Sequence, residues 1–187
     1  MPNSRPAPPL PKNEGRRLAA LRRLKLIDTP PDLAFDRLTR LAARVGGVQS
    51  AAVSLIDRDR CWFKSSIRLP VTELPREQTF CAFTVAQQEL LVVPDVAADP
   101  RFREAAKATC TRNIRFYAGA PLNSPDGACI GTLCLLDPAP RAVFDQADRA
   151  NLRDIARLVE DEIARHAESE PRAADDACAV DWEDWAR

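Results

Sequence analysis

The stretch that decides the fold is IRFYAGAPLNSPDGACIGTLCLLD, residues 114–137. Its two halves, 114–122 and 128–137, are rich in aliphatic and aromatic residues, and a cluster of Asn, Ser, Pro, Asp and Gly separates them. Such a pattern predicts two antiparallel strands joined by a hairpin turn. A second pair of apolar runs, 50–57 and 61–67, is joined by alternating Asp and Arg residues. The sequence therefore predicts two separate β-hairpins.

Helical patterns flank these hairpins. Residues 14–28 are predicted to be a helix, and Pro31-Asp32 is typical of the start of a second one, which Gly46-Gly47 would end. A last helix opens near Asp145, where Asp148 gives the spacing of a capping box. We expect the first and last helices to pair. The last helix carries one apolar stripe, formed by Leu152, Ile155, Ala156, Val159 and Ile163.

Shorter elements are expected between the hairpins. The stretch TFCAFTV (79–85) should begin a short helix, and LLVVPD (90–95) should be a brief strand that Pro94 ends. Asp99-Pro100 indicates another short helix, which reaches the Ala-rich residues 104–109. Two hairpins and helical connections can share one antiparallel sheet with long helices on one face. The predicted fold class is therefore α+β.

Composition excludes several classes of function. Among 187 residues, Lys+Arg and Asp+Glu both count 27, so the balanced charge favours neither nucleic acid nor an anionic membrane as a partner. No apolar run approaches the roughly 18 residues of a spanning helix, and the N-terminus lacks a signal-peptide core. We expect a cytoplasmic protein with a flexible Pro-rich tail at 1–13 and an acidic flexible tail at 169–187. In the second tail, Trp182 and Trp185 are spaced like a short docking motif.

The cysteines do not have the spacing of a metal site. No C-x-x-C pair occurs, and His166 is the one histidine. In a cytoplasmic chain, reduced and mostly buried thiols are the expectation. The six cysteines are Cys61, Cys81, Cys110, Cys129, Cys134 and Cys178.

Several stretches, in this order, resemble bacterial GAF domains of the branch that precedes histidine kinases and diguanylate cyclases. They are AAVSLIDRDRCWFKSS, FCAF, VVPDVAADPRF and the hairpin quoted first, within a resemblance that covers 14–168. It implies a central antiparallel sheet with terminal helices on one face and a loop-enclosed pocket on the other. It further implies a sensory or regulatory role in signal transduction, a homodimer formed through the terminal helices, and a separate signalling output protein.

One departure from that branch bears on cofactors. The branch commonly has His two residues after the Cys of its FCAH stretch, where this chain has Phe83. Because His ligates haem and pairs with Cys in bilin-binding members, its absence argues against both haem and bilin. The family's cyclic-nucleotide motif is not visible either, so the sequence leaves the ligand unknown.

The resemblance directs attention to a pocket on the loop side of the sheet. An apolar pocket with few polar anchors suits a flat or aromatic small molecule. In the alternative, the aromatic residues fill the cavity and the domain acts only in dimerisation. The expected pocket residues are Trp62, Phe80, Cys81, Phe83, Phe116, Tyr117 and Cys134, with Asp95, Arg115 and Thr132 as polar groups.

Two thiol-based alternatives remain open. The chain is similar in layout to GAF-type free methionine-R-sulfoxide reductases, in which Cys110 would attack the sulfoxide and Cys81 would resolve the sulfenic acid. Against this, Cys134 and Leu136 stand where those enzymes carry acidic groups for the substrate ammonium, and a further family glutamate falls near Tyr117. The other alternative is a redox sensor that uses Cys81, Cys110 or Cys134 without turnover.

Overall fold

The computed structural model describes residues 8–102 and 113–169 of the chain. Its strands are β1 (Ser50–Ile56), β2 (Arg60–Ile67), β3 (Glu73–Pro75), β4 (Leu91–Val93), β5 (Phe116–Asn123) and β6 (Cys129–Asp137). Its helices are α1 (Glu14–Arg23), α2 (Leu33–Val45), α3 (Phe80–Gln87) and α4 (Gln146–Ser169), and η1 (Arg76–Gln78) is a short 3-10 helix.

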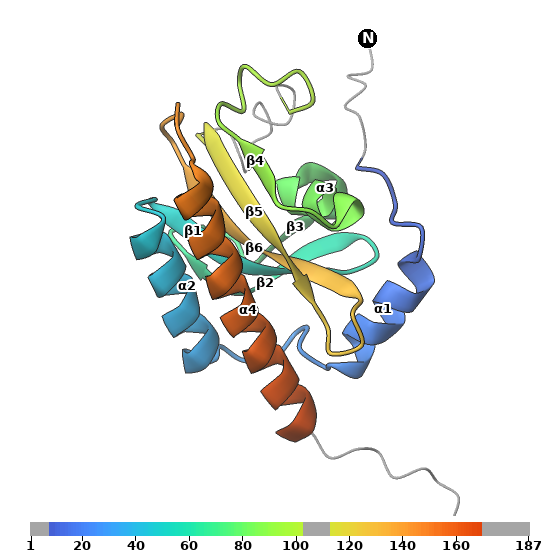
Figure 1. Cartoon of the computed structure of the whole chain (residues 1–187). Helices are drawn as coiled ribbons and strands as arrows, with labels where there is room; N and C mark the ends of the chain where they lie inside the picture. Colours follow the sequence, from blue (N-terminus) through green and yellow to red (C-terminus); the bar gives the residue numbers. More distant parts are fainter. Residues whose placement is uncertain (1–7, 103–112, 170–187) are drawn as a thin grey trace, which may run out of the picture.

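The strands form one antiparallel sheet in the order β3-β2-β1-β6-β5-β4. Helices α2 and α4 cover one face of this sheet, and α3 lies against the other (Figure 1). We refer to these two sides as the helix face and the α3 face. The predicted α+β class and its central antiparallel sheet are confirmed.

Both predicted hairpins are present. In the β5–β6 hairpin, Tyr117 pairs with Leu136 and Gly119 with Cys134. Its turn needs a residue that tolerates a left-handed backbone, and Gly127 supplies it with φ of 77°. The Gly127 amide donates to the Ser124 carbonyl at 2.8 Å, which closes the turn.

The helix ends are set by the capping residues that the sequence indicated. The Asp32 carboxylate accepts from the Ala34 amide at 2.8 Å at the start of α2. At α4, Asp145 and Asp148 each accept from the other's backbone amide, at 2.9 and 3.1 Å. This reciprocal pair is a capping box with Asp in place of Glu, and it confirms the predicted helix start.

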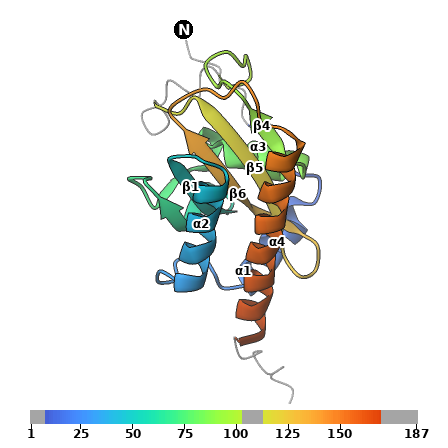
Figure 2. The ribbon, with the colours of Figure 1, turned by 60° about the vertical axis from the view of Figure 1, so that its left-hand side comes forward.

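The helix pairing differs from the expectation. The last helix pairs with α2 rather than with the first helix, and the two stand side by side on the helix face (Figure 2). Helix α1 stops at Arg23, short of residue 28, because Lys25 and Asp28 adopt left-handed backbone angles that end the helical run. Strand β3 was also missed, because three residues in a Pro-containing loop carry no periodic signal.

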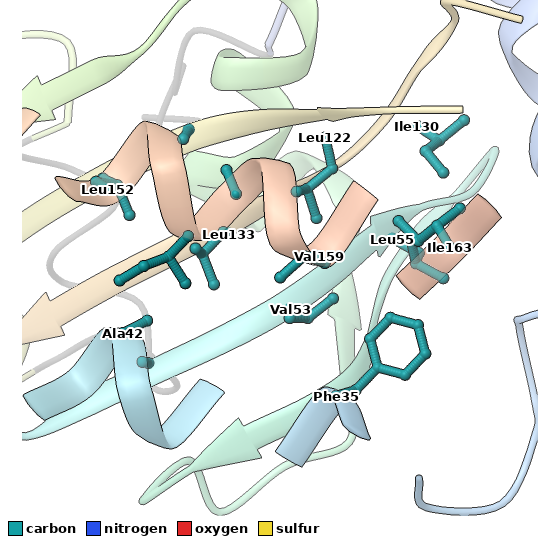
Figure 3. Packing of buried hydrophobic residues seen from close by; sticks show 14 of the residues in the cluster. Phe35, Ala42, Val53, Leu55, Leu122, Ile130, Leu133, Leu152, Val159 and Ile163 are labelled. Atoms are coloured by element: carbon teal, nitrogen blue, oxygen red, sulfur yellow. The ribbon is translucent and has the colours of Figure 1, made fainter. Parts of the chain in front are cut away.

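A largely aliphatic core fills the space between the sheet and the two long helices. Alternate residues of the central strands, such as Val53 and Leu133, meet the inner stripe of α4 and Phe35 of α2 (Figure 3). Ala42 lies toward Leu152, whereas Phe35 lies toward Ile163, so α2 and α4 run in opposite directions (Figure 3). The apolar stripe predicted for the last helix is entirely buried there.

Some expectations concern residues outside the described ranges. The predicted helix at 100–109 and the tail with Trp182 and Trp185 extend into those parts of the chain. Within the residues that the structure describes, none of the helices combines the length and the apolar character that crossing a membrane requires.

Candidate functional site under helix α3

Helix α3 is short and buried along most of its length. Thr79 caps it by accepting from the Ala82 amide at 3.4 Å, and Gln88 ends it with a left-handed φ of 56°. The residues from Phe80 to Val85 are all buried, so nearly the whole circumference of the helix is apolar. A helix of this kind is stable only when it is enclosed, here by β1, β5 and β6 on one side.

Aromatic rings fill much of the space between α3 and the sheet. The Phe80 ring lies 5.1 Å from the Tyr117 ring and 5.3 Å from the Phe102 ring, measured between centroids. Phe83 meets Phe102 edge to face at 4.9 Å. These are the separations that aromatic pairs prefer. The described part of this side is therefore a packed cluster of rings.

A tyrosine hydroxyl is buried at the centre of the cluster. The Tyr117 hydroxyl lies 2.9 Å from the Thr84 hydroxyl, and it donates to the Cys81 sulfur at 3.6 Å. Burial raises the pKa of Tyr117, so this hydroxyl remains protonated and acts as a donor. Gly119 makes room for it, because a Cβ at that position would lie 2.2 Å from the Tyr117 oxygen. A glycine in mid-strand is required here for that reason.

Three thiols meet beside this hydroxyl. Burial raises the pKa of the Cys61 thiol. The hydrogen bond between Cys134 and Cys81, together with burial, raises the pKa of Cys134. Hydrogen bonds from Cys134 and Cys61 lower the pKa of Cys81 instead. Thiolate character controls cysteine reactivity, so the thiol whose pKa is lowered by its neighbours, Cys81, is the one to test first. We call Cys61, Cys81, Cys134, Tyr117 and Thr84 the α3 cluster.

Two further hydroxyls connect the α3 cluster to the sheet. Thr132 donates from its hydroxyl to the Cys81 carbonyl at 3.4 Å, which ties α3 to β6. Ser54 donates to the Thr132 carbonyl at 3.0 Å, which ties β6 to β1. Both hydroxyls are fully buried and bonded, as buried polar groups should be.

Asp95 and Arg115 form a charged pair. The guanidinium of Arg115 donates to both carboxylate oxygens of Asp95, at 2.7 and 2.8 Å. This hydrogen bonding lowers the pKa of Asp95. Both side chains are partly exposed, so they form a surface ion pair rather than groups that point into the cluster.

The structure brings together six of the ten residues that were predicted to line a pocket. Two others, Trp62 and Phe116, lie on the helix face, so their predicted place on the loop side was wrong. Side chains alternate along a strand, and Trp62 faces the same way as Leu55 while Phe116 packs against Phe144 at 5.4 Å. The six that meet are Phe80, Cys81, Phe83, Tyr117, Thr132 and Cys134.

Sequence reasoning missed three members of this region, Cys61, Thr84 and Phe102. Strand alternation gave a signal for one of them, because Cys61 is adjacent to Trp62 and must face the opposite way.

Cys110, the proposed nucleophile of the reductase alternative, lies outside the described residues. Cys134 and Leu136, which stand where a reductase would hold its substrate ammonium, are buried in the apolar cluster. Among the described residues, His, Cys, Asp and Glu form no group that could hold a metal ion.

Comparison with known proteins identifies the family. The GAF domain family matches residues 30–163, which is most of the chain. A cyclic di-GMP phosphodiesterase of Pseudomonas aeruginosa is 36% identical over 152 residues, covering 81% of this chain and 26% of the relative. The chain thus spans about a quarter of that relative's length. The protein belongs to the GAF domain family, a family of sensory and regulatory domains of signal transduction, as its sequence predicted.

Solved structures share the fold at low sequence identity. The GAF domain from an Acinetobacter phosphoenolpyruvate-protein phosphotransferase gives a TM-score of 0.58 at 18% identity, over 82% of this chain and 95% of that one. A free methionine-R-sulfoxide reductase from Neisseria meningitidis, in complex with its substrate, gives 0.58 at 22% identity, over 79% and 89%. Identities this low establish the common fold alone.

Proposed function

We propose that this GAF domain is a homodimeric regulatory module of cytoplasmic signalling, which passes its state to a signalling output through helices α2 and α4. The observation that carries the proposal is an apolar patch on the outer side of these helices. Leu41 and Val45 of α2 are 41% and 45% exposed, and Leu158 of α4 is 45% exposed. Large apolar side chains that stay exposed on paired helices favour an interface.

Helix geometry supports a common patch. Leu38, Leu41 and Val45 follow an i, i+3, i+7 spacing and lie along one side of α2. Arg153 and Arg157 of α4 border a groove over β5, and Leu158 does not line that groove. The three exposed side chains thus gather along the line where α2 and α4 meet. A two-fold axis through this line would bury the same patch on both copies.

Sedimentation or light scattering over a range of concentrations tests the dimer. We expect the wild type to have twice the mass of one chain, and Leu41→Glu and Leu158→Glu to sediment as monomers, since a charge would be buried twice at a symmetric interface. Val143→Glu is the matched control, because Val143 is 71% exposed but lies before α4. A monomeric wild type, or dimers that tolerate both substitutions, would contradict the proposal.

The α3 cluster supports a second candidate function, reversible thiol oxidation. Cys61, Cys81 and Cys134 belong to one buried cluster, so Cys81 has two candidate partners for a disulfide. With hydrogen peroxide as oxidant, two thiols would lose two hydrogens to form the S–S bond, and the peroxide would be reduced to two waters. The bond would join α3 covalently to β2 or β6, which would alter the packing of α3 on the sheet.

Intact mass and peptide mapping after peroxide treatment test this candidate. We expect a loss of two hydrogens that maps to Cys81 and is absent in Cys81→Ala, whereas Cys129→Ala, a buried thiol outside the α3 cluster, behaves like the wild type. No mass change, or a disulfide that persists in Cys81→Ala, would reject it. Loss of free methionine-R-sulfoxide with a thiol reductant would instead indicate the enzyme.

The cytoplasmic assignment within this proposal rests on the thiols. Cys61, Cys81, Cys129 and Cys134 are all free in the described residues, as expected where glutathione keeps thiols reduced. The relative that this chain matches over 26% of its length is named a cyclic di-GMP phosphodiesterase. We propose a signalling output of this general kind for the present domain. A pull-down from the native cytoplasm with the dimer-defective Leu41→Glu as bait control would identify the coupled protein.

A further inference from the structure

A groove runs between α2 and the C-terminal end of β2, on the flank of α2 away from the proposed dimer patch. Its volume is about 700 Å³. Arg40 and Arg44 border it from α2, and Arg68 borders it from the end of β2. We call this feature the arginine groove. It lies on the helix face of the sheet, so it is distinct from the α3 cluster.

The three arginines of this groove are exposed. Within the part of the chain that the structure describes, the side chains of Arg40, Arg44 and Arg68 make no ion pair and no hydrogen bond. Other arginines behave differently: Arg60 pairs with Asp28 at 2.6 Å, and Arg76 with Glu14 at 2.5 Å. Three unpaired cations along one groove create a positive potential that an anion would relieve.

One carboxylate, Asp36, lines the groove beside the three arginines. Asp36 accepts a hydrogen bond from the Ser65 hydroxyl at 2.6 Å. Burial lowers the pKa of Lys64, and the charges of Asp32 and Asp36 oppose this shift. The arginines therefore remain in excess over the acidic groups of the groove.

A fourth arginine lies at the end of α2 beside the groove, and its charge is paired with Asp137 at 3.6 Å. Arg141 donates to the Gly46 carbonyl at 2.7 Å and also to the Gly47 carbonyl. The C-terminal carbonyls of α2, which would otherwise repel an anion, are thereby occupied by a guanidinium. The part of the groove near Gly47 is thus compatible with a negatively charged ligand.

We infer that the arginine groove binds a nucleotide through its phosphate groups. Arginine presents a planar fork that matches phosphate oxygens in pairs, and three such forks can hold more than one phosphate. The groove also has partly exposed apolar walls, Ala43, Val48 and Ile67, which a nucleobase can cover. Its volume is in the range of small-molecule sites and far larger than a phosphate ion needs.

Isothermal titration calorimetry of the full chain at low salt tests this inference. The probes are ATP and GTP, with adenosine and guanosine as uncharged counterparts and inorganic pyrophosphate as the phosphate part alone. We expect at least one nucleoside triphosphate to bind more tightly than pyrophosphate, and neither nucleoside to bind. Affinity should fall as salt rises, because the contact is ionic.

Variants locate the binding. Arg44→Gln and Arg68→Gln should each weaken nucleotide binding about tenfold or more, as the loss of one charge-assisted contact does. Arg37→Gln is the matched control, since Arg37 is exposed on the same helix and does not border the groove. Circular dichroism of each variant shows that the fold is retained.

Several outcomes would overturn the inference. They are no binding of any nucleotide, equal binding by Arg44→Gln and the wild type, and pyrophosphate binding as tight as that of the nucleotides. Binding only of an RNA oligonucleotide would assign the groove to a polyanion instead. The test is independent of the dimer proposal, because the groove and the apolar patch lie on opposite flanks of α2, and each has its own readout.

Discussion

The two faces of the sheet are built from different chemistry. The helix face is covered by a largely aliphatic core, in which Leu133 and Val159 are fully buried. The α3 face holds aromatic rings together with buried hydroxyls. Every free cysteine of the described residues lies on the α3 face: Cys61, Cys81, Cys129 and Cys134.

This difference separates stability from chemistry. Aliphatic burial contributes stability in proportion to area and needs no specific partner. Buried hydroxyls and thiols contribute little net stability, and they must find hydrogen-bond partners to avoid a penalty. The helix face therefore stabilises the fold through aliphatic burial, while the α3 face combines buried rings with the hydroxyls and thiols on which the proposed oxidation would act.

The largest contrast should appear between two neighbouring residues of β6 that face opposite ways. Leu133→Ala should cost about 3 to 4 kcal/mol of unfolding free energy, because it leaves a cavity in a close-packed aliphatic core. Cys134→Ala, its neighbour on the α3 face, should cost about 1 kcal/mol because only one sulfur is removed. Urea unfolding of both variants measures this. Equal losses would abolish the contrast between the faces.

A second effect tests the ion-pair network that joins α1 to the segment before α3. Glu14 of α1 binds Arg17 at 2.7 Å and Arg76 at 2.5 Å, and Arg76 directly precedes the segment that caps α3. Burial alone would raise the pKa of Glu14, but the hydrogen bonds from both arginines lower it to about 2. Glu14→Gln would leave two buried arginines without their carboxylate and should cost about 2 to 3 kcal/mol.

The same group makes a pH prediction. Because the folded-state pKa of Glu14 lies below its unfolded value of 4.5, its stabilisation is complete above about pH 5 and is lost as the pH falls toward 2. Unfolding free energies measured across this range should therefore fall more steeply for the wild type than for Glu14→Gln. Parallel curves for the two proteins would show that the carboxylate contributes nothing to the network.

Local signals were enough to predict most of the fold. Turn residues and apolar runs gave both hairpins, and the Asp145–Asp148 spacing gave the start of α4, because these features depend on neighbours in sequence. Helix pairing could not be predicted in this way. Both α1 and α2 carry apolar stripes. The path of the chain across the sheet determines that α2, and not α1, lies beside α4.

The site could be predicted only in part, because it too depends on contacts between residues that are distant in the sequence. Side-chain type indicated that Trp62 and Phe116 were buried, but the direction in which each points follows from strand register. The meeting of Cys61, Cys81 and Cys134 depends on β2 and β6 flanking β1 while α3 crosses over them. These residues are 20 and 53 positions apart in the sequence, so no local pattern connects them.

A smaller effect measures the polar part of the α3 face. Tyr117→Phe removes the hydroxyl that lies 2.9 Å from Thr84 and donates to Cys81 at 3.6 Å. We expect a loss of about 1.5 kcal/mol, since the ring still packs on Phe80 while the buried Thr84 hydroxyl loses a partner. Thermal unfolding checks the value. Phe80→Leu serves as a packing control, because it leaves the hydrogen bond between Tyr117 and Thr84 intact. A loss as large as that of Leu133→Ala would show that this network is a main source of stability.

The smallest effect is expected at Cys81 itself. Its sulfur is one of several small groups around the Tyr117 hydroxyl, which keeps Thr84 as a partner when the sulfur is removed. Cys81→Ala should therefore unfold with a loss of about 1 kcal/mol and an unchanged denaturant slope, because a buried free thiol packs like a small apolar group. Retained stability together with a lost response to peroxide would assign Cys81 to chemistry rather than to the fold. Gross unfolding of the variant would contradict this, because the thiol would then be an essential part of the packing on the α3 face.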